Sequence, residues 1–227
     1  MRKVGKLIAI DGVDASGKQT HAELLYKKIK ESGKKVRMIS FPAYDNSSSS
    51  LVKMYLSGEF GEKPGDVSAY AASSFFAADR FATFRTDWGK DYNDDTIIIA
   101  DRYVSSNMIH QASKLKKDER DDFLDWLDNF EFEIYSLPRP DVTIFLDMPP
   151  EFGAKLMKDR ENKFSGESEK DIHERNSEYL LESYENACFV ADKYNWKKVV
   201  CVKNKEIRTI DEINNELYDI VKRIIGE

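Results

Sequence analysis

Apolar runs and helix-like segments alternate along the chain. Five short apolar runs predict β-strands, and most of the segments between them place apolar residues at helical spacing. The predicted strands cover residues 6–11, 36–41, 96–101, 141–147 and 199–202. The run at 96–101 is continuously apolar and ends in an acid, which is typical of a parallel strand buried on both faces. This alternation predicts an α/β fold with helices on both faces of a five-stranded parallel sheet.

The same patterns predict where the helices lie. We expect helices at 17–32, 66–88, 123–135 and 207–225, and over most of 149–194. The polar stretch 46–50 is interpreted as a helix start rather than a linker, because apolar residues follow it at helical spacing. The polar interruption at 159–170 predicts a lid at about 155–175 that folds over the sheet edge. Without a repeat or a second-domain boundary, residues 1–227 are expected to form one domain.

A phosphate-binding pattern follows the first predicted strand. Gly12, Gly17 and Lys18 match G-x-x-x-x-G-K-[ST], in which backbone N–H groups and a helix N-terminus surround a polyphosphate. The residues expected to bind nucleotide phosphates are Gly12, Val13, Asp14, Ala15, Ser16, Gly17, Lys18, Gln19 and Thr20. Gln19 stands where a Ser or Thr hydroxyl normally contacts Mg²⁺, and Thr20 is turned about 100° away on the helix. Mg²⁺ is therefore expected to rely on carboxylates, water and the nucleotide.

Composition narrows the class of protein. The 227 residues carry a formal net charge of -6, which argues against a general nucleic-acid binder, because affinity for phosphate backbones comes from accumulated Lys and Arg. No apolar run approaches the ~20 residues that a membrane span needs. Cys188 and Cys201 fit neither a disulfide framework nor a metal-ligand spacing and are expected to be buried thiols. We expect a cytoplasmic protein without nucleic-acid or membrane partners.

Polar residues also mark the ends of the other predicted strands. Phe41-Pro42 ends the second strand, Asp101-Arg102 the third and Asp147 the fourth. Ligands of such sheets bind beyond the carboxyl ends of the strands. The strand ends and the lid are therefore expected to line one cleft.

Five motifs, taken in order, resemble those of the thymidylate kinases, a family of P-loop nucleoside monophosphate kinases. They are Gly12 to Thr20, Phe41-Pro42, Phe76-Ala77-Ala78-Asp79-Arg80, Asp101-Arg102-Tyr103-Val104-Ser105-Ser106-Asn107 and Asp171-Ile172-His173-Glu174. The resemblance covers nearly the whole chain. It implies a P-loop NTPase-type three-layer α/β/α fold, transfer of the γ-phosphoryl group of ATP to dTMP giving dTDP and ADP, and a requirement for Mg²⁺. It also implies a homodimer, for which the aromatic-rich helix at 75–84 is a candidate contact.

The resemblance assigns roles to residues on the phosphate side. Lys18 and the loop amides hold the ATP phosphates, and Arg102 is placed to hold the acceptor phosphate through two hydrogen bonds. Asp14 binds the 3′-hydroxyl of the acceptor sugar and approaches the metal. Asp101 and Glu174 are the other Mg²⁺ candidates, directly or through water. A second role open to Asp101 is to orient Arg102, and one open to Glu174 is to order a sugar hydroxyl. The alternative for Asp101 is an acid that caps a helix.

A lid cation is also implied. Ala15 stands where some members carry an Arg, and members without that Arg place the catalytic Arg in the lid. The local candidates are Lys158, Arg160 and Lys163, of which Arg160 is preferred for transition-state charge. The alternative is a solvated, charged helix end.

The base is expected to meet three residues. Phe76 and Arg80 share a helix face one turn apart, and the resemblance implies that Phe76 stacks on thymine and Arg80 donates to a base carbonyl, while Asn107 reads the base edge. Cytosine's amino group would leave the Arg donor unpaired, so thymine or uracil is favoured. The alternative for Phe76 is a core position. The remaining predicted contacts of dTMP are Asp14, Phe41, Tyr44, Arg102, His110 and His173.

Two departures from the family leave ribonucleotide exclusion open, because His110 and His173 stand where members carry aromatic hydroxyls. One rival hypothesis is a kinase for UMP, CMP or another monophosphate. The other is a P-loop nucleotide-switch protein, which would hydrolyse ATP slowly without needing a monophosphate.

Overall fold

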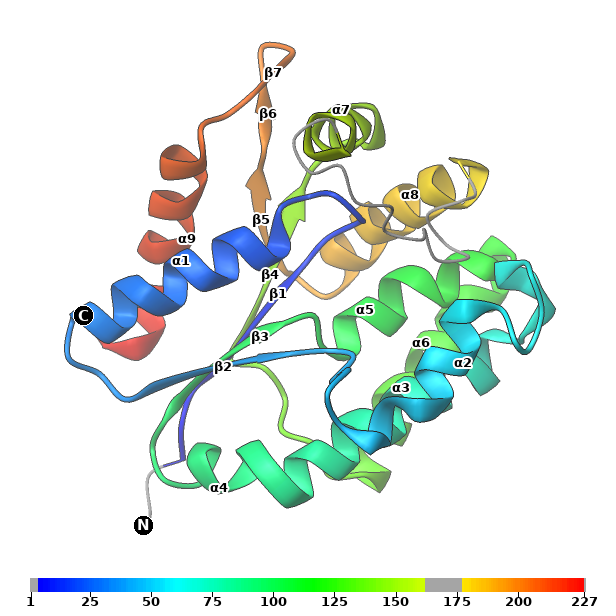
Figure 1. The fold of residues 1–227 in the computed structure, drawn as a ribbon, viewed down its shortest axis with the longest axis horizontal. Coiled ribbons are helices and arrows are strands. Elements are labelled where there is room, and N and C mark those ends of the chain that lie inside the picture. The colour runs from blue at the N-terminus through cyan, green and yellow to red at the C-terminus, as the bar shows by residue number, and fades with distance from the viewer. Residues whose placement is uncertain (1–3, 162–176, 227) are drawn as a thin grey trace.

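The computed structural model describes residues 4–161 and 177–226, and its centre is a five-stranded sheet with helices on both faces (Figure 1). The strands are parallel and lie in the order β2-β3-β1-β4-β5. Their bounds are β1 Leu7–Asp11, β2 Val36–Ser40, β3 Ile97–Asp101, β4 Val142–Asp147 and β5 Lys197–Val200. The predicted α/β fold with a five-stranded parallel sheet is confirmed.

The described helices are α1 Lys18–Glu31, α2 Ser50–Ser57, α3 Ala69–Thr83, α4 Gly89–Tyr92, α5 Val104–His110, α6 Arg120–Asp128, α7 Pro150–Glu161, α8 Ser177–Lys193 and α9 Ile210–Ile225. A described helix lies in each segment predicted to be helical, whereas the short helices α4 and α5 were not predicted. Side chains set several starts: Ser68 and Thr209 cap α3 and α9 by accepting backbone N–H groups. The helix start predicted at 46–50 is confirmed, because Asn46 caps a 3₁₀ turn that leads into α2.

The two faces of the sheet have separate apolar cores, because alternate residues of a strand point to opposite faces. On one face Ile8 and Ile10 pack with apolar residues of α1 and α9. On the other face Leu7 and Ala9 pack with residues of α5 and α6. Figure 1 shows α1 and α9 together on one side of the strands and α5 and α6 on the other. This packing fixes the carboxyl ends of β1 and β3 relative to the helices that follow them.

Two predicted helices are not continuous α-helices. Residues 66–88 begin with a 3₁₀ turn at Pro64–Asp66, form α3, and end in a π-helix at Phe84–Trp88. Likewise, α6 continues as a π-helix over Asn129–Ile134. The prediction of regular helices there was therefore wrong in detail, because apolar spacing does not reveal the extra residue that a π-turn inserts.

The fifth predicted strand, 199–202, also requires correction. The fifth strand of the sheet is Lys197–Val200, whereas Val202–Lys203 (β6) pairs antiparallel with Glu206–Ile207 (β7) in a hairpin that projects beyond the sheet (Figure 1). Cys201 lies between them, and its N–H donates to the Asp147 carbonyl. Asn204 and Lys205, the hairpin turn, both have positive φ. Only Asn204 is a residue type that signals such a turn.

The predicted lid at about 155–175 lies largely outside the described residues, which stop at 161 in α7 and resume at 177 in α8. Among the described helices, none is long and apolar enough to cross a bilayer. Both cysteines are free thiols, and Cys201 is buried as expected, whereas Cys188 is only half-buried.

Candidate active site

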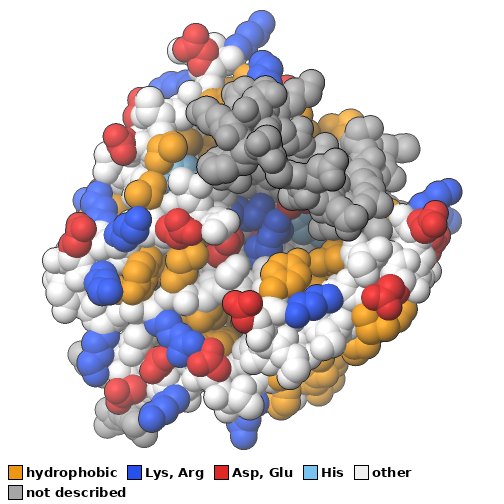
Figure 2. Space-filling view, in the orientation of Figure 1, with side chains coloured by type: hydrophobic (Ala, Val, Ile, Leu, Met, Phe, Trp, Pro, Cys, Tyr) orange, Lys and Arg blue, Asp and Glu red, His pale blue; other side chains and the backbone are white. Residues whose placement is uncertain are grey.

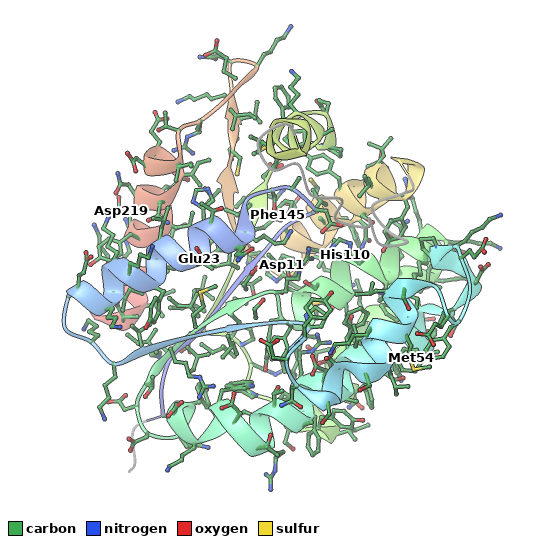
Figure 3. All side chains as sticks on the ribbon, viewed as in Figure 1. Asp11, Glu23, Met54, His110, Phe145 and Asp219 are labelled. Carbon is green, nitrogen blue, oxygen red and sulfur yellow. The ribbon has the colours of Figure 1, made fainter. Side chains whose placement is uncertain are left out.

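A cavity lies beyond the carboxyl ends of β1, β2 and β3. Its wall is formed by Asp14, Phe41, Pro42, Tyr44, Leu56, Phe76, Arg80, Arg102, Ser106, Asn107, His110 and Gln111. Figure 2 shows Lys, Arg and His side chains gathered in a central hollow, and Figure 3 places Asp11 and His110 near the centre of the same view. Most residues predicted to contact the acceptor nucleotide therefore line one cavity.

The loop between β1 and α1 has the geometry that a phosphate site needs. Gly17 has φ +83° and precedes Lys18, and this N-cap residue makes no side-chain hydrogen bond to the first turn of α1. The first N–H groups of this helix are thus available to an anion. Gly12 is also constrained, because a Cβ there would lie 2.6 Å from Ser16 Oγ and 2.9 Å from the Leu146 carbonyl oxygen.

Charged side chains connect this loop to the cavity. Arg102 Nη2 donates to Asp14 Oδ1 at 2.5 Å, and Lys18 Nζ lies 4.0 Å from the same oxygen. Lys18 is buried, and its Nζ donates to the Val13 carbonyl at 2.7 Å. Arg102 Nη1 lies 3.4 Å from His110 Nε2. Two positive groups therefore flank one carboxylate where the loop meets the cavity.

The protonation states follow from this arrangement. Burial opposes ionisation of Asp14, but the charges of Arg102 and Lys18 outweigh it and hold its pKa well below the ordinary value. Burial, and then the neighbouring charge of Arg102, lowers the pKa of Lys18 to about 8. Burial also opposes the charge on Arg102, yet Asp14 keeps the pKa of that guanidinium above its usual value. Asp14 and Arg102 remain a charged pair near neutral pH.

Two more acids lie at the ends of β1 and β3. Asp11 is fully buried, and its carboxylate accepts hydrogen bonds from Ser105 Oγ, Ser106 Oγ and the Gly12 N–H, so it joins the start of the loop to the first turn of α5. Asp101 differs, because its Oδ1 finds no hydrogen-bond partner among the described residues. Burial raises the pKa of Asp101, while Arg102 and Lys18 oppose that rise.

The backbone of Arg102 is in an unusual conformation. Its φ is +68°, in the left-handed region that disfavours side chains with a Cβ, and its N–H donates to the Ile10 carbonyl at 3.0 Å. A strained conformation of this kind persists only where the surrounding structure holds the residue in place, and it is often found at functional sites. Here it turns Arg102 from the end of β3 toward Asp14.

The residues predicted to contact the base lie together on another wall of the cavity. Phe76 is half-buried, and its ring lies edge-on to Tyr55 at a centroid distance of 6.1 Å. Arg80 is 1% exposed and pairs with the fully buried Glu131 through two 2.6 Å hydrogen bonds. Asn107 Nδ2 donates to the Ser73 carbonyl and to Glu131. Three segments far apart in the sequence therefore meet at Glu131.

Another buried acid, Asp79, holds the loop after β2. Asp79 accepts hydrogen bonds from the Ala43 N–H at 2.8 Å and from Ser48 Oγ at 2.5 Å. These bonds fix the loop that carries Tyr44, which lines the cavity although half of its surface is exposed. Phe41 is buried beneath this loop and contacts the Tyr103 ring.

Not every predicted site residue reaches this region. Gln19 is exposed and donates to Glu23 at 3.0 Å, and neither Gln19 nor Thr20 lines the cavity. His173 and Glu174 lie outside the described residues, as does the side chain of Arg160 in the last turn of α7. Within the described part of the chain, no three acidic, His or Cys side chains form a ready-made metal cluster.

Sequence reasoning missed Glu131 and gave no role to Asp79, although Asp79 is part of a quoted motif. A signal for Glu131 was present, because it continues the buried stripe of Phe123, Leu124 and Leu127 at helical spacing. An acid on an apolar stripe requires a buried partner. The sequence does not say which cation supplies it.

Comparisons with known proteins agree with this geometry. A family model described as thymidylate kinase matches residues 10–205. The thymidylate kinase of Mycobacterium tuberculosis (strain CDC 1551 / Oshkosh) is 32% identical over 173 residues, which cover 76% of this chain and 79% of that protein. The probable thymidylate kinase of Sulfolobus acidocaldarius is 29% identical over 218 residues, or 95% of each chain. The solved thymidylate kinase from Candida albicans has a similar fold, with a TM-score of 0.70, 23% identity, and coverage of 97% of this chain and 92% of that one.

Proposed function

The chain belongs to the thymidylate kinase family and is a nucleoside monophosphate kinase, and we propose that its cavity binds dTMP while its glycine loop binds ATP. The reaction transfers the γ-phosphoryl group. The bond between the γ-phosphorus and the bridging oxygen of ATP breaks, a bond to a phosphate oxygen of dTMP forms, and the products are ADP and dTDP.

One observation carries this proposal: the Arg102–Asp14 ion pair joins the phosphate loop to the wall of the base-reading cavity. Phosphoryl transfer depends on aligning two anionic substrates and stabilising the charge that develops between them. Lys18 and the loop N–H groups would hold the donor phosphates, and Arg102 would hold the acceptor phosphate. The attacking phosphate oxygen is already ionised near neutral pH, so the reaction does not depend on a general base.

The remaining contacts of dTMP follow from the cavity wall. Asp14, which stays ionised, would accept a hydrogen bond from the 3′-hydroxyl of the sugar. Phe76 would stack on the base, with Arg80 and Asn107 at its edge, and His110 would lie near the sugar. Phe41 and Tyr44 would close the cavity on the β2 side, because both line it.

We also propose that Mg²⁺ takes part. Asp101 supports this, because its Oδ1 has no hydrogen-bond partner within the described chain and a hard cation prefers oxygen ligands. Asp101 would hold the ion directly or through water, with Asp14 nearby. When bound, Mg²⁺ would supply charge neutralisation at the phosphates. A site of few protein ligands fits Mg²⁺, which keeps several waters and binds substrate phosphates.

The rest of the proposal rests on the family and the sequence. Residues 1–227 would form one domain with a lid at about 155–175, from which Arg160 stabilises transition-state charge. His173 and Glu174 would follow the lid, near the sugar and the Mg²⁺ respectively. A cytoplasmic location is supported by the two free thiols, since disulfides are rare in reducing compartments.

A homodimer is the proposed assembly, formed through an aromatic face made of Tyr70, Phe81, Trp126, Phe130, Ile134 and Tyr135. The Tyr70 and Phe81 side chains are 41% and 38% exposed, and that of Ile134 is 66% exposed. The side chains of this face contact one another through their rings. The ring centroids of Tyr70 and Trp126 lie 4.7 Å apart, and those of Phe81 and Tyr135 lie 4.9 Å apart. Hydrophobic side chains also follow the lower right edge of Figure 2, near the position of α3 and α6 in Figure 1.

Charges on this face are expected to separate the protomers. Light scattering should give a dimer mass for the unchanged protein and a monomer mass for Tyr70→Lys/Phe81→Lys, because the buried lysines would lose hydration. Phe189→Lys, on the equally exposed α8 surface, is the matched control and should stay dimeric. A monomeric unchanged protein would refute the dimer.

The function itself is tested by ADP formation from ATP and Mg²⁺ with dTMP, dUMP, UMP, CMP, AMP or GMP added separately. We expect the highest kcat/KM with dTMP and loss of turnover when EDTA removes Mg²⁺. A preference for UMP or CMP would favour the rival kinase hypothesis. Slow ATP hydrolysis that no monophosphate stimulates would favour the nucleotide switch.

A further inference from the structure

A buried carboxylate lies behind the wall of the cavity that carries Arg80 and Asn107. Glu131 has no exposed surface, and its two oxygens accept hydrogen bonds from two different nitrogens of Arg80: Nε donates to Oε2 and Nη2 donates to Oε1, each at 2.6 Å. Such a two-point contact fixes the plane of the guanidinium as well as its position. Glu131 itself does not line the cavity.

The same carboxylate also orients Asn107. The Asn107 Nδ2 donates to Glu131 Oε1 at 3.3 Å and to the Ser73 carbonyl at 3.2 Å, so both hydrogens of the amide nitrogen have partners. An amide side chain is oriented by the partners of its nitrogen and oxygen. With its nitrogen held by two acceptors, Asn107 keeps its carbonyl oxygen as the atom that can accept from a ligand.

Glu131 also determines which hydrogens of Arg80 remain free to donate. Glu131 accepts the Nε hydrogen and one of the two Nη2 hydrogens, and Nη1 donates to the Tyr103 carbonyl at 3.4 Å. Of the five N–H hydrogens of the guanidinium, one on Nη1 and one on Nη2 therefore remain for the cavity that Arg80 lines. The wall therefore presents N–H donors of Arg80 beside the carbonyl acceptor of Asn107.

We propose that Glu131 is a specificity-determining positioning residue that fixes these donors and this acceptor against the base. A pyrimidine that presents a carbonyl to Arg80 and a ring N–H to Asn107 satisfies both, as thymine and uracil do. Cytosine in the same orientation presents an amino group to a donor and a bare ring nitrogen to an acceptor. The inference rests on dTMP being the acceptor and adds the group that enforces the choice of base.

The energetics of Glu131 support a role beyond stability. A buried ion pair is often no more stabilising than well-packed apolar residues of similar volume, so stability alone gives little reason to place Arg80 and Glu131 there. Glu131 lies on the π-helix that continues α6, and π-turns occur frequently at functional sites. Its neighbour Glu133 is exposed and pairs with Arg139 on the surface.

The test compares Glu131→Gln with Glu133→Gln, which makes the same chemical change on the exposed side of the same π-helix. Gln has one acceptor oxygen, and its NH₂ group faces donors of Arg80 or Asn107, so the array is broken. In Glu131→Gln we expect the KM for dTMP to rise by about tenfold or more, the KM for ATP to change less than about twofold, and the kcat/KM preference for dTMP over dCMP to fall by about tenfold or more. Glu133→Gln should match the unchanged enzyme.

A folded Glu131→Gln enzyme that keeps its dTMP KM and its preference over dCMP would overturn the inference, as would an equal rise in both KM values. If Glu131→Gln does not unfold cooperatively, and so is not properly folded, the double variant Arg80→Met/Glu131→Met is tested in its place. It removes both buried charges together and leaves neither unpaired. The double variant should lose the base preference and keep its KM for ATP; an undiminished preference would overturn the inference. Failure of the unchanged enzyme to phosphorylate dTMP would instead remove the proposed function.

Discussion

Lys18→Met is expected to reduce phosphoryl transfer by at least about 10³-fold, because a preorganised cation at the transferring phosphate contributes several kcal/mol to transition-state stabilisation. The structure holds Lys18 at the start of α1, with Nζ on the Val13 carbonyl and 4.0 Å from Asp14. A bound phosphate would replace these partners. Methionine keeps the buried stem of the side chain and removes the ammonium group with its one hydrogen bond to the Val13 carbonyl, so the fold should persist. The measurement is kcat for ADP formation at saturating dTMP.

Lys27→Met is the matched control, because Lys27 lies on the same helix and is exposed. It should retain full turnover. Thermal unfolding of both variants shows whether the fold is intact. A folded Lys18→Met enzyme with normal kcat would contradict the role assigned to the loop.

Arg102→Lys should lower kcat/KM for dTMP by about 10² to 10³-fold, with a much smaller effect on the KM for ATP. Lysine preserves the charge but presents a single nitrogen. Arg102 instead uses two nitrogens: Nη2 donates to Asp14, and Nη1 lies near His110 Nε2. One ammonium cannot occupy both positions. A phosphate that depends on the fork of Arg102 would therefore be misaligned with the donor.

Arg139→Lys supplies the comparison for this experiment. Arg139 also makes a two-point contact, with Asp128 at 2.6 and 2.8 Å, but on the surface. Exposed pairs of this kind contribute little, so kinetics and stability should change only slightly. If Arg102→Lys behaved like Arg139→Lys, the acceptor phosphate would have to be held elsewhere.

The glycine loop was predictable because its function is local in the sequence. Gly12, Gly17 and Lys18 act within one turn between a strand and a helix, so their spacing alone predicts the backbone geometry. The sheet was predictable for a related reason, since continuous apolar runs followed by polar residues indicate buried parallel strands and the edge where ligands bind. The conformation of Arg102 was not predictable, because its backbone N–H donates to the Ile10 carbonyl of β1, which is distant in the sequence.

The hairpin after β5 and the two π-helices show where the spacing of apolar residues is not enough to predict the bounds of an element. Val202 follows Cys201 and Val200 in an apolar run, yet the run divides because Cys201 bonds back to the end of β4. A π-turn adds one residue without changing which residues are apolar. In the hairpin, a hydrogen bond to a segment distant in the sequence marks where the strand ends, and in the π-helices the change is a local one that apolar spacing does not reveal.

The sequence by itself determined the parallel α/β fold, the phosphate loop, the family and most of the residues that line the cavity, because each of these depends on periodicity or on a short contiguous motif. Only the tertiary structure decided that Asp14 meets Arg102, that Asp79 fixes the loop after β2, and that Glu131 joins Arg80 to Asn107. These partners are separated by up to 88 residues in the chain. A buried charge requires a partner, but its choice of partner depends on which helices and strands pack together.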